Sequence, residues 1–316
     1  MSPELTVIVT VVEGGAALVR CLDALSIQID PPAMEVIVPY DDTIAAVNGL
    51  QPRFPGVRFL ALGCITVPDT KADAFAQHVR YDCRRAGGLR AARGRLVGML
   101  EDRGWPRADW ARTMVLLHDS LPHAAVGGAI ESGAEGIVRK AVFFCDFGRY
   151  EQPVPNSDAE YLSDINICYK RTALEGVRSL WEQRYQEATV NWALRRQGLH
   201  LSAQPRVVQQ REALSLRQAL TERVQWGRTF GQVRGRTTSR SSCILRVAAA
   251  PLLPPLLLLR HIRKQLSLGR RPWSFVSVMP ATIVLLLFWT IGEAIGELEA
   301  ACAITPRSNN PGVSLS

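Results

Sequence analysis

The sequence predicts an α/β fold, a doubly wound and mainly parallel sheet followed by a hydrophobic helical tail at a membrane. Three observations lead to this prediction. Short β-branched runs alternate with helical patterns over the first 130 residues, no charged residue occurs between Pro272 and Gly292, and basic residues are concentrated just before that apolar run. Hydrophobic residues make up 47% of the 316-residue chain and charged residues 21%, a composition that excludes intrinsic disorder.

The strands and helices are expected in alternation along the body. Continuous apolar or β-branched runs predict strands at 5–12, 34–38, 57–62, 96–100 and 125–128. Apolar residues at helical spacing predict helices at 16–25, 71–93 and 109–117. Such alternation implies right-handed crossovers, and ligands then bind at the carboxyl ends of the strands.

Carboxylates stand at two of those strand ends. Asp41 and Asp42 follow the second strand, whereas Glu101 and Asp102 follow the fourth. Asp41 or Asp42 alone could equally cap the next helix, but Glu101 and Asp102 precede a loop, so capping explains them less well. Paired carboxylates could hold Mg²⁺ or Mn²⁺, which would neutralise a leaving diphosphate. The sequence contains neither G-x-G-x-x-G nor a P-loop motif.

The C-terminal third predicts a membrane partner. Residues 272–292 are about long enough to cross a bilayer as a helix, and 247–259 form a shorter apolar run with three prolines, which favours an in-plane or re-entrant segment. The basic stretch 260–271 between them is expected on the cytoplasmic side. The alternative is a buried helical hairpin. The N-terminus lacks a basic n-region, so we expect a cytosolic catalytic domain on the cytoplasmic face of the cell inner membrane.

The basic charge is local. Residues 195–271 carry a net charge of +14 while the rest of the chain carries −6. This segment has few interleaved aromatic residues and adjoins an apolar run, so we expect no nucleic-acid partner. The seven cysteines form no C-x-x-C pair, which indicates a reducing compartment, and the five histidines lack zincin spacing.

Several segments, taken together and in order, resemble family 2 glycosyltransferases with the nucleotide-sugar-binding GT-A fold. The resemblance covers residues 4–236. It rests on LTVIVTVVEGG, EVIVPYDDT, RAARGRLVGMLEDRGWPRADW, YLSDINICYKRTAL, RYQEATVNWALRRQGLHL and QWGRTFGQVRGR. It implies a GT-A domain at 1–236, a basic linker with membrane-associated helices at 237–300, and a flexible tail at 301–316.

The resemblance also implies roles for individual residues. Glu187 would be the catalytic base of an inverting transfer. Asp102, helped by Glu101, would bind the divalent cation, either Mg²⁺ or Mn²⁺. The nucleotide-sugar donor would be bound by Asp41 or Asp42, Glu101, Asp102, Asn166, Arg228 and Arg234, the last two lying on the family's closing loop. A lipid-linked or glycan acceptor fits the membrane tail.

One departure from the family pattern keeps an alternative open. The acidic motif reads Glu-Asp-Arg, and Arg103 stands where a third carboxylate is common. Arg103 could pair with phosphate directly or mark a weakened metal site. A catalytically degenerate, membrane-tethered protein that binds nucleotide sugars is therefore the second interpretation.

Overall fold

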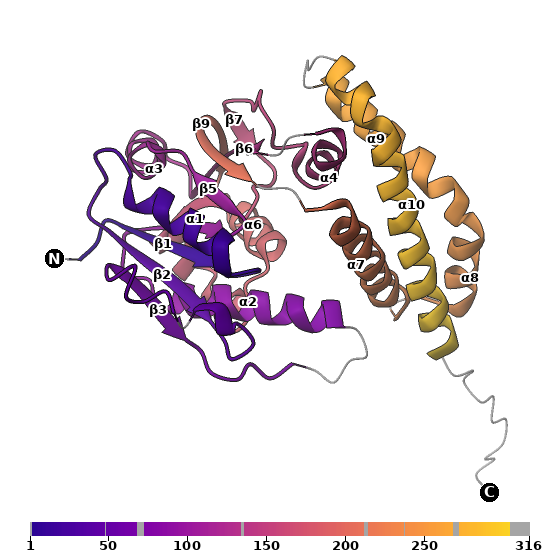
Figure 1. Ribbon diagram of the computed structural model, residues 1–316, viewed down its shortest axis with the longest axis horizontal. Helices are drawn as coiled ribbons and strands as arrows, with labels where there is room; N and C mark the ends of the chain where they lie inside the picture. The colour runs from indigo at the N-terminus through magenta and orange to yellow at the C-terminus, as the bar shows by residue number, and fades with distance from the viewer. Residues whose placement is uncertain are drawn as a thin grey trace, which may run out of the picture.

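The computed structural model describes residues 2–303 except 48, 68–72, 134–135, 212–213, 237 and 268–271. A twisted sheet with helices on both faces forms the body, and a layer of long helices stands beside it (Figure 1). The strands are β1 Leu5–Thr10, β2 Met34–Tyr40, β3 Val57–Ala61, β4 Leu96–Glu101, β5 Gly104–Pro106, β6 Ala125–Ser132, β7 Ser157–Ala159, β8 Asn166–Lys170 and β9 Leu201–Arg211. The body helices are α1 Gly15–Ser26, α2 Asp73–Ala91, α3 Trp110–Ser120, α4 Ile137–Phe147, α5 Arg171–Glu175 and α6 Glu187–Arg196, with short 3₁₀ turns at Ala45–Val47 and Arg178–Leu180.

The sheet is mixed but mainly parallel. Its order is β3-β2-β1-β4-β8-β6-β9-β5, and β7 pairs with β9. The strands β3, β2, β1, β4, β6 and β9 run in one direction, while β8, β5 and β7 run against it. The predicted α/β fold class is therefore confirmed.

Alternating residues of the central strands bury the two faces of the sheet. On one face, Leu5, Val7 and Val9 of β1 pack with α1 and α3. On the other face, Ile8 packs with α2 and α6. Because β1 and β4 are covered on both sides, they read as continuous apolar runs in the sequence.

The C-terminal layer contains four helices, α7 Leu216–Arg236, α8 Arg240–Ala249, α9 Leu253–Ser267 and α10 Pro272–Ala303. In Figure 1, α10 runs the length of this layer between α7, which faces the body, and α8 and α9. The 3₁₀ turn Ala250–Leu252 interrupts the second apolar run at its first proline, and the other two prolines lie in the first turn of α9, where no backbone donor is needed. By length and composition, Arg240–Arg263 and Val276–Cys302 could each cross a bilayer.

The α7–α10 contact is unusually close because glycines line it. A Cβ atom on Gly227 or Gly231 of α7 would meet backbone atoms of α10, and one on Gly292 or Gly296 of α10 would meet backbone atoms of α7. Side chains tie the same two helices together, with Arg228 bound to Glu299. The two helices therefore form one unit.

The expected elements are largely found, with shifts of one to four residues at their ends. The strand expected at 125–128 extends to Ser132, and the long helix expected at 71–93 is described from Asp73 to Ala91. Residues 71–72 and 304–316, which include most of the expected flexible tail, lie outside the described residues. The expectation of a closing loop at residues 225–236 is wrong, because these residues are helical and belong to α7.

Candidate active site

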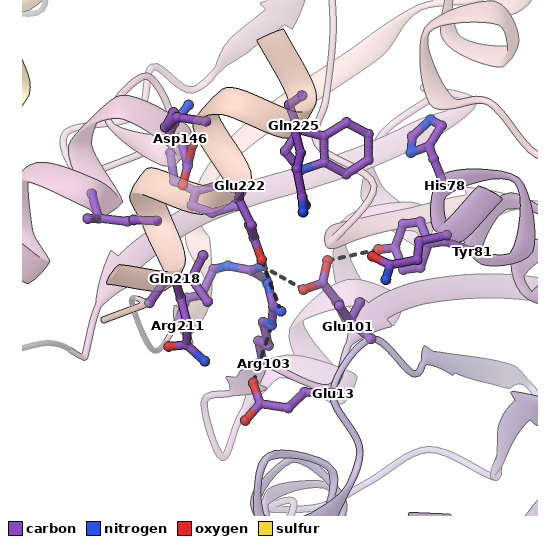
Figure 2. A pocket seen from close by; sticks show the side chains of 18 of the residues that line it. Glu13, His78, Tyr81, Glu101, Arg103, Asp146, Arg211, Gln218, Glu222 and Gln225 are labelled. Carbon is purple, nitrogen blue, oxygen red and sulfur yellow. Dashed lines mark hydrogen bonds and ion pairs between the residues drawn. The ribbon is translucent and has the colours of Figure 1, made fainter. Parts of the chain in front are cut away.

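A cavity of about 840 Å³ opens at the carboxyl ends of the parallel strands. Its walls come from the segments after β1, β2 and β4 and from the helices α2, α4 and α7 (Figure 2). Its charged lining residues are Glu13, Arg80, Arg84, Glu101, Arg103, Asp146, Arg211, Glu222 and Arg223. The position agrees with the rule that open α/β sheets bind ligands at this edge.

Glu101 is the carboxylate at the centre of this cavity (Figure 2). Its Oε1 accepts a hydrogen bond from Arg211 Nη2 at 2.6 Å, and its Oε2 accepts one from the Tyr81 hydroxyl at 2.8 Å. Burial opposes ionisation of Glu101, but the charges of Arg211 and Arg103 outweigh it and keep the pKa of Glu101 below its usual value. Glu101 is therefore an ionised, fully paired carboxylate.

Asp102 is held by backbone donors, and the structure does not support its predicted role as a metal ligand. Its carboxylate accepts backbone hydrogen bonds from Val12 at 3.0 Å, Glu13 at 3.0 Å and Gly14 at 2.6 Å. Asp102 is 1% exposed and does not line the cavity. It satisfies the donors of the β1–α1 turn, and this turn carries Glu13 to the cavity rim.

Of the two candidate aspartates after β2, Asp41 is the one connected to the site. It is buried, its Oδ1 accepts from the Thr43 backbone N–H at 2.8 Å, and its Oδ2 accepts from Arg84 Nε at 2.8 Å. Burial opposes its ionisation, yet the bonds from Thr43 and Arg84 hold the pKa of Asp41 below its usual value. Thr43 and Arg84 line the cavity, whereas Asp42 is exposed and does not.

Glu187 lines a second cavity, of about 970 Å³, which shares Tyr81, Glu101 and Asp146 with the first. Glu187 is the first residue of α6, and its Oε2 accepts a hydrogen bond from the Asp164 backbone N–H at 2.9 Å. Burial raises the pKa of Glu187 although Arg85 acts against it. A carboxylate with a raised pKa beside a cavity has the properties of a general base.

Asp164, in the same cavity, is bound differently. It is buried and forms an ion pair with Arg85. Burial raises the pKa of Asp164 to about 6 although the charge of Arg85 acts against it. Because the Asp164 carboxylate is paired with Arg85, Glu187 is the carboxylate better placed to accept a proton from a ligand.

Asn166 does not reach either cavity, so the structure does not support its predicted role in donor binding. Its amide donates to the Ala129 carbonyl at 2.9 Å, and its Oδ1 accepts from Trp110 Nε1 at 2.8 Å. Asn166 is 1% exposed. It is a hydrogen-bonded core residue that ties β8 to β6 and α3.

Arg228 and Arg234 are also placed away from the lining of the cavities. Arg228 Nε bonds Glu299 Oε2 at 2.9 Å, and Arg234 Nε bonds Glu297 Oε1 at 2.6 Å. Both guanidinium groups therefore face α10 because α7 is a helix packed along it. The donor-binding role predicted for them is not supported.

The described residues do not fit the expected divalent cation. They contain no group of three or more His, Cys, Asp or Glu side chains that could hold a metal ion. Asp102 is bound to backbone N–H groups, and Glu101 lies between the guanidinium groups of Arg103 and Arg211. Two fixed positive charges beside the remaining carboxylate disfavour a dication there.

Sequence reasoning missed the contribution of α2. Tyr81, Arg84 and Arg85 project from one side of it into the two cavities, with Gln77 and His78 one turn earlier. A polar stripe at helical spacing within an otherwise buried helix was the available signal. Arg211 and Glu222 gave no comparable signal, because their place depends on how β9 and α7 pack.

No protein-family model matches the chain, and no curated protein matches its sequence. Several solved structures are similar to it. The mannosyltransferase PcManGT from Pyrobaculum calidifontis, in complex with GDP-Man and Mn²⁺, is 19% identical with a TM-score of 0.45, over 97% of this chain and 77% of that chain. TarS from S. aureus is 12% identical with a TM-score of 0.48, over 70% of this chain and 39% of that one.

A second TarS structure, residues 1–349 in complex with UDP, is 12% identical with a TM-score of 0.44, over 92% and 90% of the two chains. Similarity at this level does not establish a family for this chain.

Proposed function

We propose that this chain is an inverting, nucleotide-sugar-dependent glycosyltransferase of the family 2, GT-A type. The observation that carries the proposal is the pair of joined cavities at the carboxyl edge of the sheet. One is rich in arginine, and the other contains Glu187, a carboxylate with a raised pKa. A nucleoside diphosphate would occupy the arginine-rich cavity, and the acceptor hydroxyl would lie beside Glu187.

The proposed reaction follows from this arrangement. Glu187 takes the proton of the acceptor hydroxyl as its oxygen attacks the anomeric carbon of the sugar. The bond from that carbon to the diphosphate breaks on the opposite side, and the nucleoside diphosphate leaves with the bonding pair. Fixed cations stabilise the charge that develops on the leaving group. No step passes through a metal, because the residues expected to hold one do not fit.

An acceptor that carries phosphate suits the second cavity. Arg149 and Arg195 line it, and Arg149 lies over the rings of Tyr150 and Tyr161 at 5.0 and 5.3 Å. Guanidinium groups bind phosphate oxygens as a fork. A lipid-linked phosphate glycan therefore fits better than an uncharged sugar.

The transferase proposal is tested by donor binding and turnover together. The detergent-solubilised full chain is titrated with UDP-, GDP- and TDP-sugars, and nucleoside diphosphate release is measured with a polyprenyl-phosphate acceptor. We expect Glu187→Gln to retain donor binding and lose turnover, with Glu182→Gln, a partly exposed glutamate that lines neither cavity, as the control. Binding without turnover in the wild-type chain would favour the degenerate, nucleotide-sugar-binding interpretation.

We also propose that the C-terminal helices lie in the plane of the membrane surface, on the cytoplasmic side of the inner membrane. One side of α10 exposes Ile283, Leu287, Ile291, Ile295 and Leu298, which recur at helical spacing. The adjoining α8 and α9, with the 3₁₀ turn between them, expose Ile244, Leu245, Leu252, Leu256, Leu259 and Leu266. The exposed apolar side chains and the neighbouring basic residues Arg260 and Arg263 suit a bilayer with anionic headgroups.

The opposite side of α10 argues against spanning. Val278 and Leu285 pack in one apolar cluster with α4 and α7. The rings of Trp289 and Phe230 lie with their centroids 6.0 Å apart, and Gly296 lies against the backbone of α7. A bilayer around α10 would have to include α7 with its five arginines and Glu222. Charged side chains in hydrocarbon are costly, which supports in-plane binding.

Binding to vesicles tests this placement. We expect the double variant Leu287→Glu/Ile291→Glu to lose most binding to vesicles that contain anionic lipid while keeping the wild-type melting temperature, since both residues are about half exposed. Leu116→Glu, equally exposed but on α3, is the matched control. Unchanged vesicle binding by the double variant would contradict the proposal.

A further inference from the structure

Two arginines stand side by side at the floor of the first cavity. Arg103 lies in the turn between β4 and β5, and Arg211 is the last residue of β9. The neighbouring residue Gly104 begins β5 and pairs with Arg211 in the β5–β9 ladder. The β5–β9 ladder therefore brings the backbones of Arg103 and Arg211 near each other, and both side chains line the cavity (Figure 2).

Neither guanidinium group is fully satisfied. Arg211 is 6% exposed, and only its Nη2 is bonded, to Glu101 at 2.6 Å, while its buried Nη1 has no hydrogen-bond partner among the described residues. The Nε of Arg103 is buried and lacks a hydrogen bond in the same way. Buried donors are normally paired, so donors left free on the wall of a cavity indicate a ligand with acceptor oxygens.

The partners of Arg103 are loose and replaceable. Its Nε lies 3.4 Å from Glu13 Oε2 and its Nη2 lies 3.5 Å from Glu222 Oε1 (Figure 2). Glu13 and Glu222 are 55% and 35% exposed, so each can turn into solvent without an uncompensated loss. Glu222 thus occupies the place that an incoming anion would take.

Of the three other arginines in the cavity lining, Arg80, Arg84 and Arg223, two are already paired. Arg84 binds Asp41, and Arg223 binds Asp146. Among the described residues that line the cavity, Arg103 and Arg211 are the arginines with buried N–H groups that have no hydrogen-bond partner. The non-bridging oxygens of a diphosphate match two adjacent guanidinium forks.

We propose that Arg103 and Arg211 bind the diphosphate of a nucleoside diphosphate in place of a divalent cation, and that the diphosphate displaces Glu222 of α7 from Arg103. This inference rests on the proposed function and names how its donor is held. It accounts for the Glu-Asp-Arg motif without a loss of activity, because an arginine supplies the charge that a metal would otherwise supply.

Calorimetric titration of the detergent-solubilised full chain with UDP, GDP and TDP, in EDTA and separately in Mn²⁺, tests the inference. We expect one nucleoside diphosphate to bind equally well in EDTA and in Mn²⁺. Arg103→Gln should weaken that binding about 10- to 100-fold, the range for lost charge-assisted hydrogen bonds. Arg112→Gln, an exposed arginine on α3, should leave it unchanged.

Glu222→Gln distinguishes ligand competition from a structural role. It removes the anion that competes for Arg103, so affinity should rise roughly two- to fivefold, whereas loss of a purely structural pair would not raise it. Binding that requires Mn²⁺, or that survives Arg103→Gln unchanged, would overturn the inference and leave the transferase proposal intact. Failure of every nucleoside diphosphate to bind under both conditions would overturn both.

Discussion

Gly231→Ala sets two known effects against each other in the α7–α10 contact. Alanine is the better helix former by about 1 kcal/mol, so helix propensity alone predicts a more stable protein. A Cβ atom at residue 231 would, however, meet the Glu293 carbonyl and lie 2.9 Å from the Glu297 backbone nitrogen. These are backbone atoms of a packed helix and cannot rotate away, so α7 and α10 must separate.

The size of the net effect follows from those contacts. Overpacking that moves backbone costs about 1–3 kcal/mol, and separation of the helices by a few tenths of an ångström or more also weakens the dispersion contacts along the interface. Against the gain of about 1 kcal/mol from propensity, we expect a net loss of about 2 kcal/mol. For a chain of this size that corresponds to a fall in melting temperature of roughly 4 °C.

Thermal unfolding of the full chain in one detergent provides the assay. Gly56→Ala is the control, because a Cβ at residue 56 has no neighbour within 4 Å. Its melting temperature should stay within about a degree of wild type, since it changes no packing. If Gly231→Ala is as stable as wild type or more so, the close α7–α10 contact is not present in solution and the argument for an in-plane α10 loses its basis.

Further predictions concern the site. Glu187→Gln should lower kcat about 10²- to 10⁴-fold while donor affinity stays within about twofold, as measured by diphosphate release and calorimetry, because a general base acts on the acceptor. Asp102→Ala should destabilise the metal-free protein by about 3 kcal/mol near pH 5, because three backbone N–H groups lose their acceptor. Burial and the charge of Glu101 raise the pKa of Asp102 to about 6. The stabilisation of the wild-type fold by Asp102 is therefore fully present below about pH 4 and is lost as the pH rises through 6. The difference in unfolding free energy between wild type and Asp102→Ala, measured with urea, should be smaller at pH 8 than near pH 5. Asn166→Ala should lower stability by about 2 kcal/mol and leave donor affinity unchanged in the folded fraction, because it removes core hydrogen bonds outside the cavities.

The body of the fold was predictable because its signals are local. The strands β1 and β4 are buried on both faces, and their unbroken apolar runs are visible in the sequence without any knowledge of their neighbours. The strand β9, by contrast, contains polar residues and a proline, and it pairs with β6 across an irregularity in register. Its role is set by tertiary pairing, which the sequence pattern does not contain.

The site was predictable in position but not in the role of each residue. Carboxylates at the ends of β2 and β4 correctly marked the edge of the sheet that holds the cavity, and Glu187 lines the cavity next to it. Glu101 is the last residue of β4, whereas Asp102 begins the turn after it and accepts hydrogen bonds from the β1–α1 turn, so that only Glu101 lines the cavity. Which of the two does so depends on the register of β4, and no spacing rule supplied it.

The helix α7 faces two environments at once. Gln218, Glu222, Gln225 and Trp226 line the cavity, while Gly227 and Gly231 pack on α10, the helix with the exposed apolar stripe. Occupancy of the cavity and attachment to lipid then act on the same rigid element. Thermodynamic reciprocity requires that if lipid binding changes the affinity for a ligand in the cavity by some factor, that ligand changes the affinity for lipid by the same factor. An assay without lipid would therefore measure the affinity for the ligand only in the lipid-free protein.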